Sequence, residues 1–95
     1  GTSIDYLVDN KIMDIPDYIK IDVDGIEHLI LQGGLNTLKN KKIKSILIEV
    51  NEDFILQKEG ILKIMKQCNY ELLSKDNSPL FNLAKVYNYI FVNNN

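Results

Sequence analysis

Three carboxylates surround a single glycine directly after an apolar segment of the chain. Asp22, Asp24 and Glu27 flank Gly25, and residues 18–21 before them have a strand-like pattern. In an α/β sheet, ligands bind at the carboxyl ends of strands, where the backbone leaves the buried layer and a helix begins. A carboxylate placed there can orient a hydroxyl group, act as a general base or hold a divalent cation. We therefore expect the chemistry of this chain at this turn.

A second polar position follows a second apolar segment. Glu49 is the only charged residue among residues 45–50, and Asn51 comes directly after them. A charged group in an apolar strand is costly unless it lies at the strand end and is paired. Because neighbouring strands lie about 5 Å apart, Glu49 and Asn51 are expected to face the same crevice as Asp22. Together the three side chains could supply oxygen ligands for magnesium or calcium.

Each acidic residue near Gly25 also has a purely structural explanation. Asp22 could cap the next helix through its first amides, and Asp24 is of a type common in turns. Glu27 lies in the first helical turn, where the helix dipole favours a carboxylate whatever its function. The local pattern leaves both explanations open.

Apolar periodicity predicts alternating strands and helices. Strands are expected at residues 18–23, 45–50, 70–73 and 86–92. A short helix capped by Thr2 or Ser3 should open the chain, and a second should run from Ile26 to the glycine pair 33–34. Those glycines are expected in the left-handed conformation that ends helices. A further short helical piece at residues 35–38 and a long helix at about residues 54–68 complete the prediction.

The strand patterns also predict how the sheet is built. Residues 45–50 are apolar on both faces apart from Glu49, which indicates an interior parallel strand covered by helices on both sides. The polar loop around residues 76–79 contains no helix-length pattern, so the last two strands should form an antiparallel hairpin.

Composition describes an ordinary globular domain spanning residues 1–95. The chain is 45% hydrophobic and 25% charged with a net charge of −2, so neither disorder nor nucleic-acid binding is expected. Its single cysteine, Cys68, excludes an internal disulfide and fits a reducing, cytoplasmic setting; its spacing in the long helix predicts a core position. No apolar run approaches the roughly 18 residues of a membrane span, and no targeting segment is visible.

The motif sequences resemble one family. Residues 19–27 read I-K-I-D-V-D-G-I-E, residues 31–34 read L-Q-G-G, and residues 46–50 read I-L-I-E-V. They are similar to the I-K-I-D-V-E-G-A-E, L-K-G-A and I-L-x-E segments of the FkbM-type family of class I S-adenosylmethionine-dependent methyltransferases. The opening T-S-I-D of residues 2–5 is similar to the T-x-L-D segment of that family. Asp24 stands where glutamate is usual and shortens the reach of the carboxylate, whereas Gly34 replaces a common alanine.

The resemblance implies a fold. It predicts the carboxy-terminal half of a Rossmann-like class I methyltransferase fold: a mostly parallel sheet with helices on both faces and one antiparallel strand, from a terminal hairpin, inserted between its neighbours. In that family S-adenosylmethionine binds mainly to a glycine-rich loop in the first half of the sheet. No G-x-G pattern occurs here. We therefore expect the cofactor-binding residues upstream of residue 1 and the isolated chain to be an inactive fragment.

The resemblance also implies residue roles. Asp22, Glu27 and Glu49 are the expected catalytic carboxylates, and Asp24 and Asn51 the expected substrate contacts. The intact protein is expected to transfer a methyl group to an acceptor hydroxyl, with a sugar, a polyketide, a lipid head group or a nucleoside as open choices.

Three other functions remain as alternatives. An aspartate-x-aspartate after an apolar strand occurs in haloacid-dehalogenase-type phosphatases, but these place a threonine where Ile26 stands. The same three residues match the manganese motif of nucleotide-sugar glycosyltransferases, without further support. A noncatalytic α/β interaction module that retained the fold is the third alternative.

The first strand suggests self-association. In a complete sheet residues 18–23 would be paired on both edges, and here the strands of one edge are missing. An unpaired edge with Ile19 and Ile21, no proline and only one lysine, Lys20, is a template for pairing with another chain.

Overall fold

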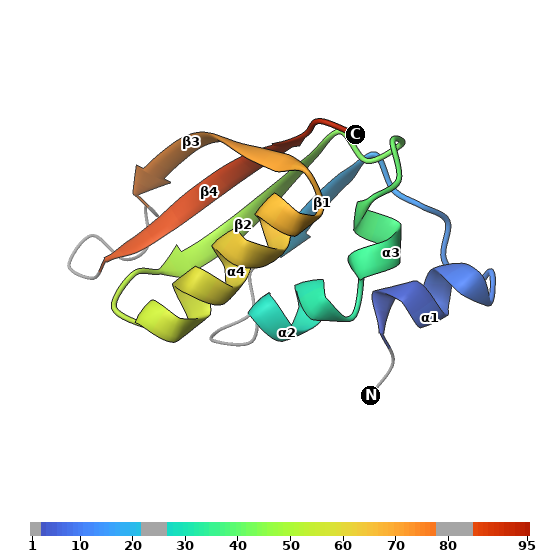
Figure 1. The fold of residues 1–95 in the computed structure, drawn as a ribbon, viewed down its shortest axis with the longest axis horizontal. Coiled ribbons are helices and arrows are strands. Elements are labelled where there is room, and N and C mark those ends of the chain that lie inside the picture. The colour runs from blue at the N-terminus through green and yellow to red at the C-terminus, as the bar shows by residue number, and fades with distance from the viewer. Residues whose placement is uncertain (1–2, 22–26, 78–84) are drawn as a thin grey trace.

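The computed structural model describes residues 3–21, 27–77 and 85–95. This part of the chain forms four helices and four strands, arranged as Figure 1 shows. The elements are α1 (Ile4–Asp9), β1 (Tyr18–Ile21), α2 (Glu27–Gln32), α3 (Leu35–Leu38), β2 (Ser45–Asn51), α4 (Ile55–Gln67), β3 (Tyr70–Asn77) and β4 (Val86–Asn93). The predicted order of strands and helices is confirmed.

The sheet is mixed, with strand order β1-β2-β4-β3. The β1–β2 pair is parallel, whereas β4 runs antiparallel to both β2 and β3. The predicted hairpin and the inserted antiparallel strand are therefore confirmed. The prediction of a mostly parallel sheet is wrong, because the central position of β4 makes two of the three pairings antiparallel.

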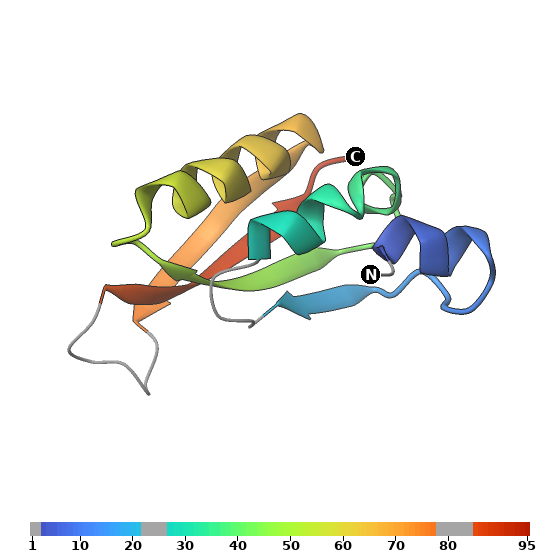
Figure 2. The same cartoon turned by 90° about the horizontal axis from the view of Figure 1, so that it is seen from below.

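The described helices cover one face of the sheet. In Figure 2, α2, α3 and α4 all lie on the same side of the strands. Along β2 the residues alternate accordingly, with Ile46, Ile48 and Val50 buried and Leu47 half-buried on the opposite face. The prediction of helices on both faces is thus wrong for the part of the chain that the structure describes: the apolar Leu47 does not indicate a second covering layer there.

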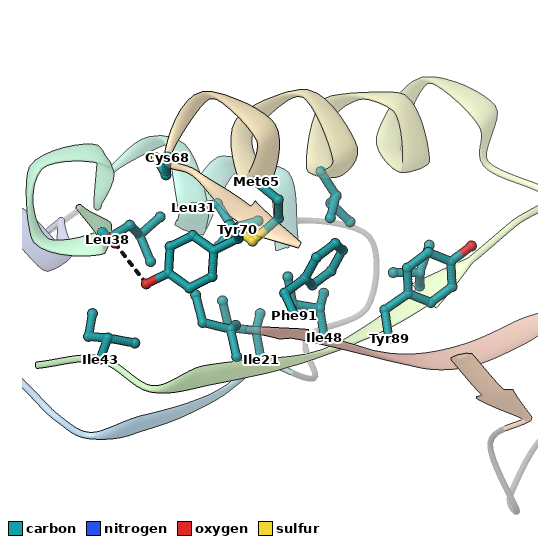
Figure 3. Close-up of a cluster of buried hydrophobic side chains, with 13 residues drawn as sticks. Ile21, Leu31, Leu38, Ile43, Ile48, Met65, Cys68, Tyr70, Tyr89 and Phe91 are labelled. Carbon is teal, nitrogen blue, oxygen red and sulfur yellow. Dashed lines mark hydrogen bonds between the residues drawn. The ribbon is translucent and has the colours of Figure 1, made fainter. Parts of the chain in front are cut away.

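The core lies between this face of the sheet and α2, α3 and α4 (Figure 3). In α4, Ile61, Met65 and Cys68 at its end are buried, so the predicted core position of Cys68 is confirmed. Tyr70 lies in the same core, and its hydroxyl donates a hydrogen bond of 2.7 Å to the Leu38 carbonyl oxygen. No helix in the described ranges is long and apolar enough to cross a membrane.

An aspartate of α1 caps α3 from a distance in sequence. Gly34 is the N-cap of α3 and has no side chain to bond the first amides. Instead, the Asp5 carboxylate accepts hydrogen bonds from the amide of Asn36 (3.0 Å), the amide of Thr37 (2.8 Å) and the Thr37 hydroxyl (2.7 Å). These bonds fasten α1 to the layer of helices that covers the sheet.

The glycine pair does not have the predicted left-handed conformation. Gly34 has φ of −125°, and neither glycine has a φ in the left-handed range. Close packing explains them instead: a Cβ at Gly33 would lie 3.0 Å from the Ser3 Cβ, and one at Gly34 would lie 3.2 Å from the Ile4 side chain. Helix α1 begins at this contact, and of its two expected capping residues Ser3 is confirmed, since its hydroxyl accepts from the Tyr6 amide at 3.1 Å.

Candidate functional site

The candidate site lies at the carboxyl ends of β1 and β2. Because these strands are parallel, both end at the same edge of the sheet, and Ile21, the last residue of β1, lies opposite Ile48 of β2. Asp22 and Asp24, predicted at this edge, lie outside the described residues. Glu27 begins α2, and its side chain also lies outside the description. Their predicted roles therefore stay predictions.

The two predicted residues of β2 share a face. Glu49 and Asn51 are both half-buried on the side of the sheet that faces away from the helices. In the β2–β4 register, Glu49 lies directly opposite Asn88 of β4. The Asn51 side-chain oxygen accepts a hydrogen bond of 3.0 Å from the Asp53 amide, which begins the turn into α4. The structure thus brings Glu49 and Asn51 together at the strand end, while Asn51 also has a local structural role.

The predicted metal set is not tested by the structure. Among the described residues, no three His, Cys, Asp or Glu side chains are close enough to hold a metal ion. Of the three predicted ligands, Glu49 is a carboxylate, Asn51 is an amide, and Asp22 lies outside the described residues.

A further carboxylate with several partners lies at this edge, and the sequence pattern did not indicate it. Glu52 follows Asn51, and its side chain is only 13% exposed. It accepts a hydrogen bond of 2.7 Å from the Lys75 ammonium of β3 and another from the Tyr89 hydroxyl of β4. The Lys58 ammonium of α4 lies 3.6 Å away. One carboxylate therefore joins α4 and both strands of the hairpin.

The contacts around Glu52 lower the pKa of its own carboxyl group and raise the pKa of the Tyr89 hydroxyl. Hydrogen bonds from Lys75 and Tyr89, with the nearby Lys58 charge, hold the pKa of Glu52 below its ordinary value despite partial burial. Burial and the adjacent carboxylate raise the pKa of Tyr89. Glu52 is consequently a stable anion at neutral pH and a poor general base, which favours a positioning or charge-organising role.

Long-range contacts explain why Glu52 was missed. Its partners Lys75 and Tyr89 lie 23 and 37 residues further along the chain. The antiparallel pairings of β2 with β4 and of β4 with β3 bring them together, and no local motif encodes these registers.

The comparisons with known proteins identify one family. The family model described as the Methyltransferase FkbM domain matches residues 1–72. The match includes all the predicted site residues and Glu52, and it ends within β3. Comparison with curated proteins and with solved structures found no match.

Proposed function

The chain belongs to the FkbM methyltransferase family, and we propose that it forms the acceptor side of a site for methyl transfer from S-adenosylmethionine to a hydroxyl group. The observation that carries the proposal is the shared edge at the carboxyl ends of β1 and β2. There Ile21, directly before the Asp22 motif, lies opposite Ile48, directly before Glu49. This is the edge at which α/β sheets bind their ligands.

We propose that the cofactor binds to residues upstream of residue 1, because the sequence has no G-x-G loop. A surface hollow of about 450 Å³ in the described part of the chain lies at the opposite, amino ends of β1 and β2. The hollow is lined by Val8, Lys11, Met13, Asp14, Ile15 and Lys42. We therefore assign the chain a role toward the acceptor alone.

Under this proposal the acidic residues position the acceptor hydroxyl and take its proton. Asp22 is the proposed base, with Glu49 and Glu27 completing the acidic site, and Asp24 and Asn51 as contacts to the acceptor. Holding the reacting oxygen in a near-attack geometry supplies most of the rate gain in such a transfer. A carboxylate that accepts the proton adds typically 10²–10⁴-fold.

Two measurements test the proposal. Titration calorimetry of the 95-residue chain with S-adenosylmethionine should show no saturable micromolar binding; such binding would mean that the cofactor site lies within these residues.

In a protein that joins this chain to a glycine-rich cofactor loop, Asp22→Asn should lower turnover by about 10²-fold or more while leaving cofactor affinity nearly unchanged. Asp9→Asn, an exposed change in α1, is the matched control. Equal turnover of Asp22→Asn and the parent protein would remove Asp22 from the catalytic residues.

A noncatalytic interaction module remains the second candidate, and one observation favours it. Within the described residues β1 pairs with β2 alone, so its other edge has no partner strand, and Tyr18 on that strand is 70% exposed. We propose that this edge lets the chain associate with itself through strand pairing. Light scattering coupled to size exclusion at micromolar concentration should show dimers or larger species. A stable monomer would contradict this self-association and, with it, the expectation that β1 is an interior strand of an incomplete sheet.

A further inference from the structure

Two lysines share one carboxylate at the proposed acceptor edge. The Lys75 ammonium lies 2.7 Å from the Glu52 carboxylate and the Lys58 ammonium 3.6 Å from the same oxygen. The longer distance exceeds that of a hydrogen bond, so Lys58 contributes charge to the cluster without bonding Glu52. Two positive charges against one negative charge leave the Glu52–Lys58–Lys75 cluster with a net charge of +1.

A β-bulge gives Lys75 its place in this cluster. In the β3–β4 pair, Leu72 lies opposite Phe91 and Ser74 opposite Ile90, so Leu73 is an extra residue on β3. Lys75 consequently lies opposite Tyr89, on the face that carries Glu52's partners. If the register of the Leu72–Phe91 pair continued without a bulge, Lys75 would lie opposite Asn88, on the other face of the sheet. Bulges commonly re-aim a side chain in this way next to functional sites.

The re-aimed lysine is held before any ligand arrives. Its ammonium lies 4.6 Å from the centre of the Tyr87 ring and 5.8 Å from that of Tyr89, within the range of cation–π attraction. With Glu52 bonded on one side, the Lys75 head group has little rotamer freedom left to lose on binding. The side chains of Lys75 and Lys58 remain 41% and 34% exposed, so both are accessible from solvent.

We propose that Lys75 and Lys58 bind an anionic group of the acceptor substrate, a phosphate or a carboxylate. The inference rests on the proposed function, because it assigns the ligand to the acceptor. Glu52 follows Asn51 at the end of β2, so the lysines lie at the same strand-end edge as Glu49. Tyr89 and α4 place the lysines on the helix-covered face and Glu49 lies on the other face, so an acceptor anchored on the lysines would reach Glu49 across the strand ends. Glu52 orients the Lys75 ammonium through its hydrogen bond. The bound anion would neutralise the positive charge of the two lysines that Glu52 does not balance.

Nuclear magnetic resonance of the 95-residue chain tests the inference with inorganic phosphate as the probe. At constant ionic strength, phosphate should shift the resonances of Lys58 and Lys75 saturably, with a millimolar dissociation constant. Lys75→Gln and Lys58→Gln should each weaken binding about fivefold or more. The control is Lys63→Gln, which changes an exposed lysine of α4, the helix that carries Lys58; this variant should bind phosphate as tightly as the parent chain. A parallel titration with acetate distinguishes the two sources: binding of acetate alone would assign a carboxylate, and preference for phosphate a phosphoryl group.

Glu52→Gln separates a binding role from a merely structural one. Glutamine keeps an oxygen for the Tyr89 hydroxyl and the Lys75 ammonium but removes the competing negative charge. Phosphate should therefore bind roughly fivefold more tightly to this variant. Absence of saturable phosphate and acetate binding in both the parent and folded Glu52→Gln would overturn the inference, as would equal weakening by Lys63→Gln and Lys75→Gln. None of these measurements involves methyl transfer, so their failure would leave the proposed function standing.

Discussion

Removing the Asp5 carboxylate should cost the chain a substantial part of its stability. Asp5→Ala deletes three hydrogen bonds that join α1 to the start of α3. The Asn36 amide is exposed, so water can replace its bond. Thr37 is only 5% exposed, and its amide and hydroxyl would both lose a charged acceptor. A buried donor left without a partner costs about 1–3 kcal/mol; allowing for partial hydration of the gap, we expect a loss of about 2–3 kcal/mol.

That loss is large for a domain of this size. Stability of about 0.05–0.15 kcal/mol per residue gives roughly 5–14 kcal/mol for the whole chain. The midpoint of thermal unfolding should fall by about 10–20 °C. Urea denaturation followed by circular dichroism measures the change directly, with Asp9→Ala, an exposed change in the same helix, as the control. A loss below about 0.5 kcal/mol, or one equal to that of Asp9→Ala, would refute the capping argument.

The same bonds predict a pH dependence. Partial burial raises the pKa of the Asp5 carboxyl, but the hydrogen bonds from Thr37 and Asn36, with the nearby Lys39 charge, outweigh it and hold the pKa below its ordinary value of 3.8. A depressed pKa in the folded state stabilises the protein above the pKa of the unfolded chain. That contribution should be complete above about pH 5 and disappear as the pH falls below 3.8. Acid titration of Asp5→Asn should show a shallower loss of stability than the parent.

Three further changes test other parts of the structure. Lys11→Gly should stabilise the chain by about 0.5–1 kcal/mol in urea denaturation, because Lys11, just after α1, has a φ of 57°, a left-handed conformation that favours glycine. Asn69→Gly, just after α4 with a φ of 63°, should stabilise less, since asparagine tolerates the left-handed conformation. Equal gains in stability for the two variants would contradict the argument. Tyr70→Phe should cost about 1–3 kcal/mol by leaving the buried Leu38 carbonyl without a donor, against less than 0.5 kcal/mol for the exposed Tyr6→Phe. Burial raises the pKa of Tyr70 from 10.0 to about 12, so the folded state holds the phenol proton more tightly than the unfolded chain does. The free energy of unfolding should therefore fall as the pH rises above about 10, and it should fall less in Tyr70→Phe.

Periodicity predicted the elements well because each depends on neighbouring residues. Helix α4 begins and ends within one residue of its predicted bounds, and its stripe through Ile61, Met65 and Cys68 faces the core as expected. Tyr18 and Lys20 alternate with Ile19 and Ile21 as a half-buried strand requires. These patterns are local, so no knowledge of the sheet is needed to read them.

Predictions that depended on distant contacts were less successful. The apolar Leu47 suggested a strand that helices cover on both faces. In the structure Leu47 is half-buried on the face away from the helices, and the sequence pattern is the same in both cases. Gly33 and Gly34 looked like residues chosen for a left-handed turn, whereas the structure needs them for the approach of α1. The Glu52 contacts were invisible because they depend on hairpin register and on an extra residue at Leu73.

The order of the strands has a consequence for synthesis on the ribosome. Strand β4 follows the other three in sequence but lies between β2 and β3 in space (Figure 1). While residues 86–93 are still inside the ribosomal tunnel, β3 has no partner strand in the described sheet and β2 has only β1. Both strands then present open edges, which are templates for pairing with other nascent chains. A premature stop just before Val86 would leave that arrangement permanent, so even a truncation that spares the whole FkbM match at residues 1–72 should yield an aggregating product.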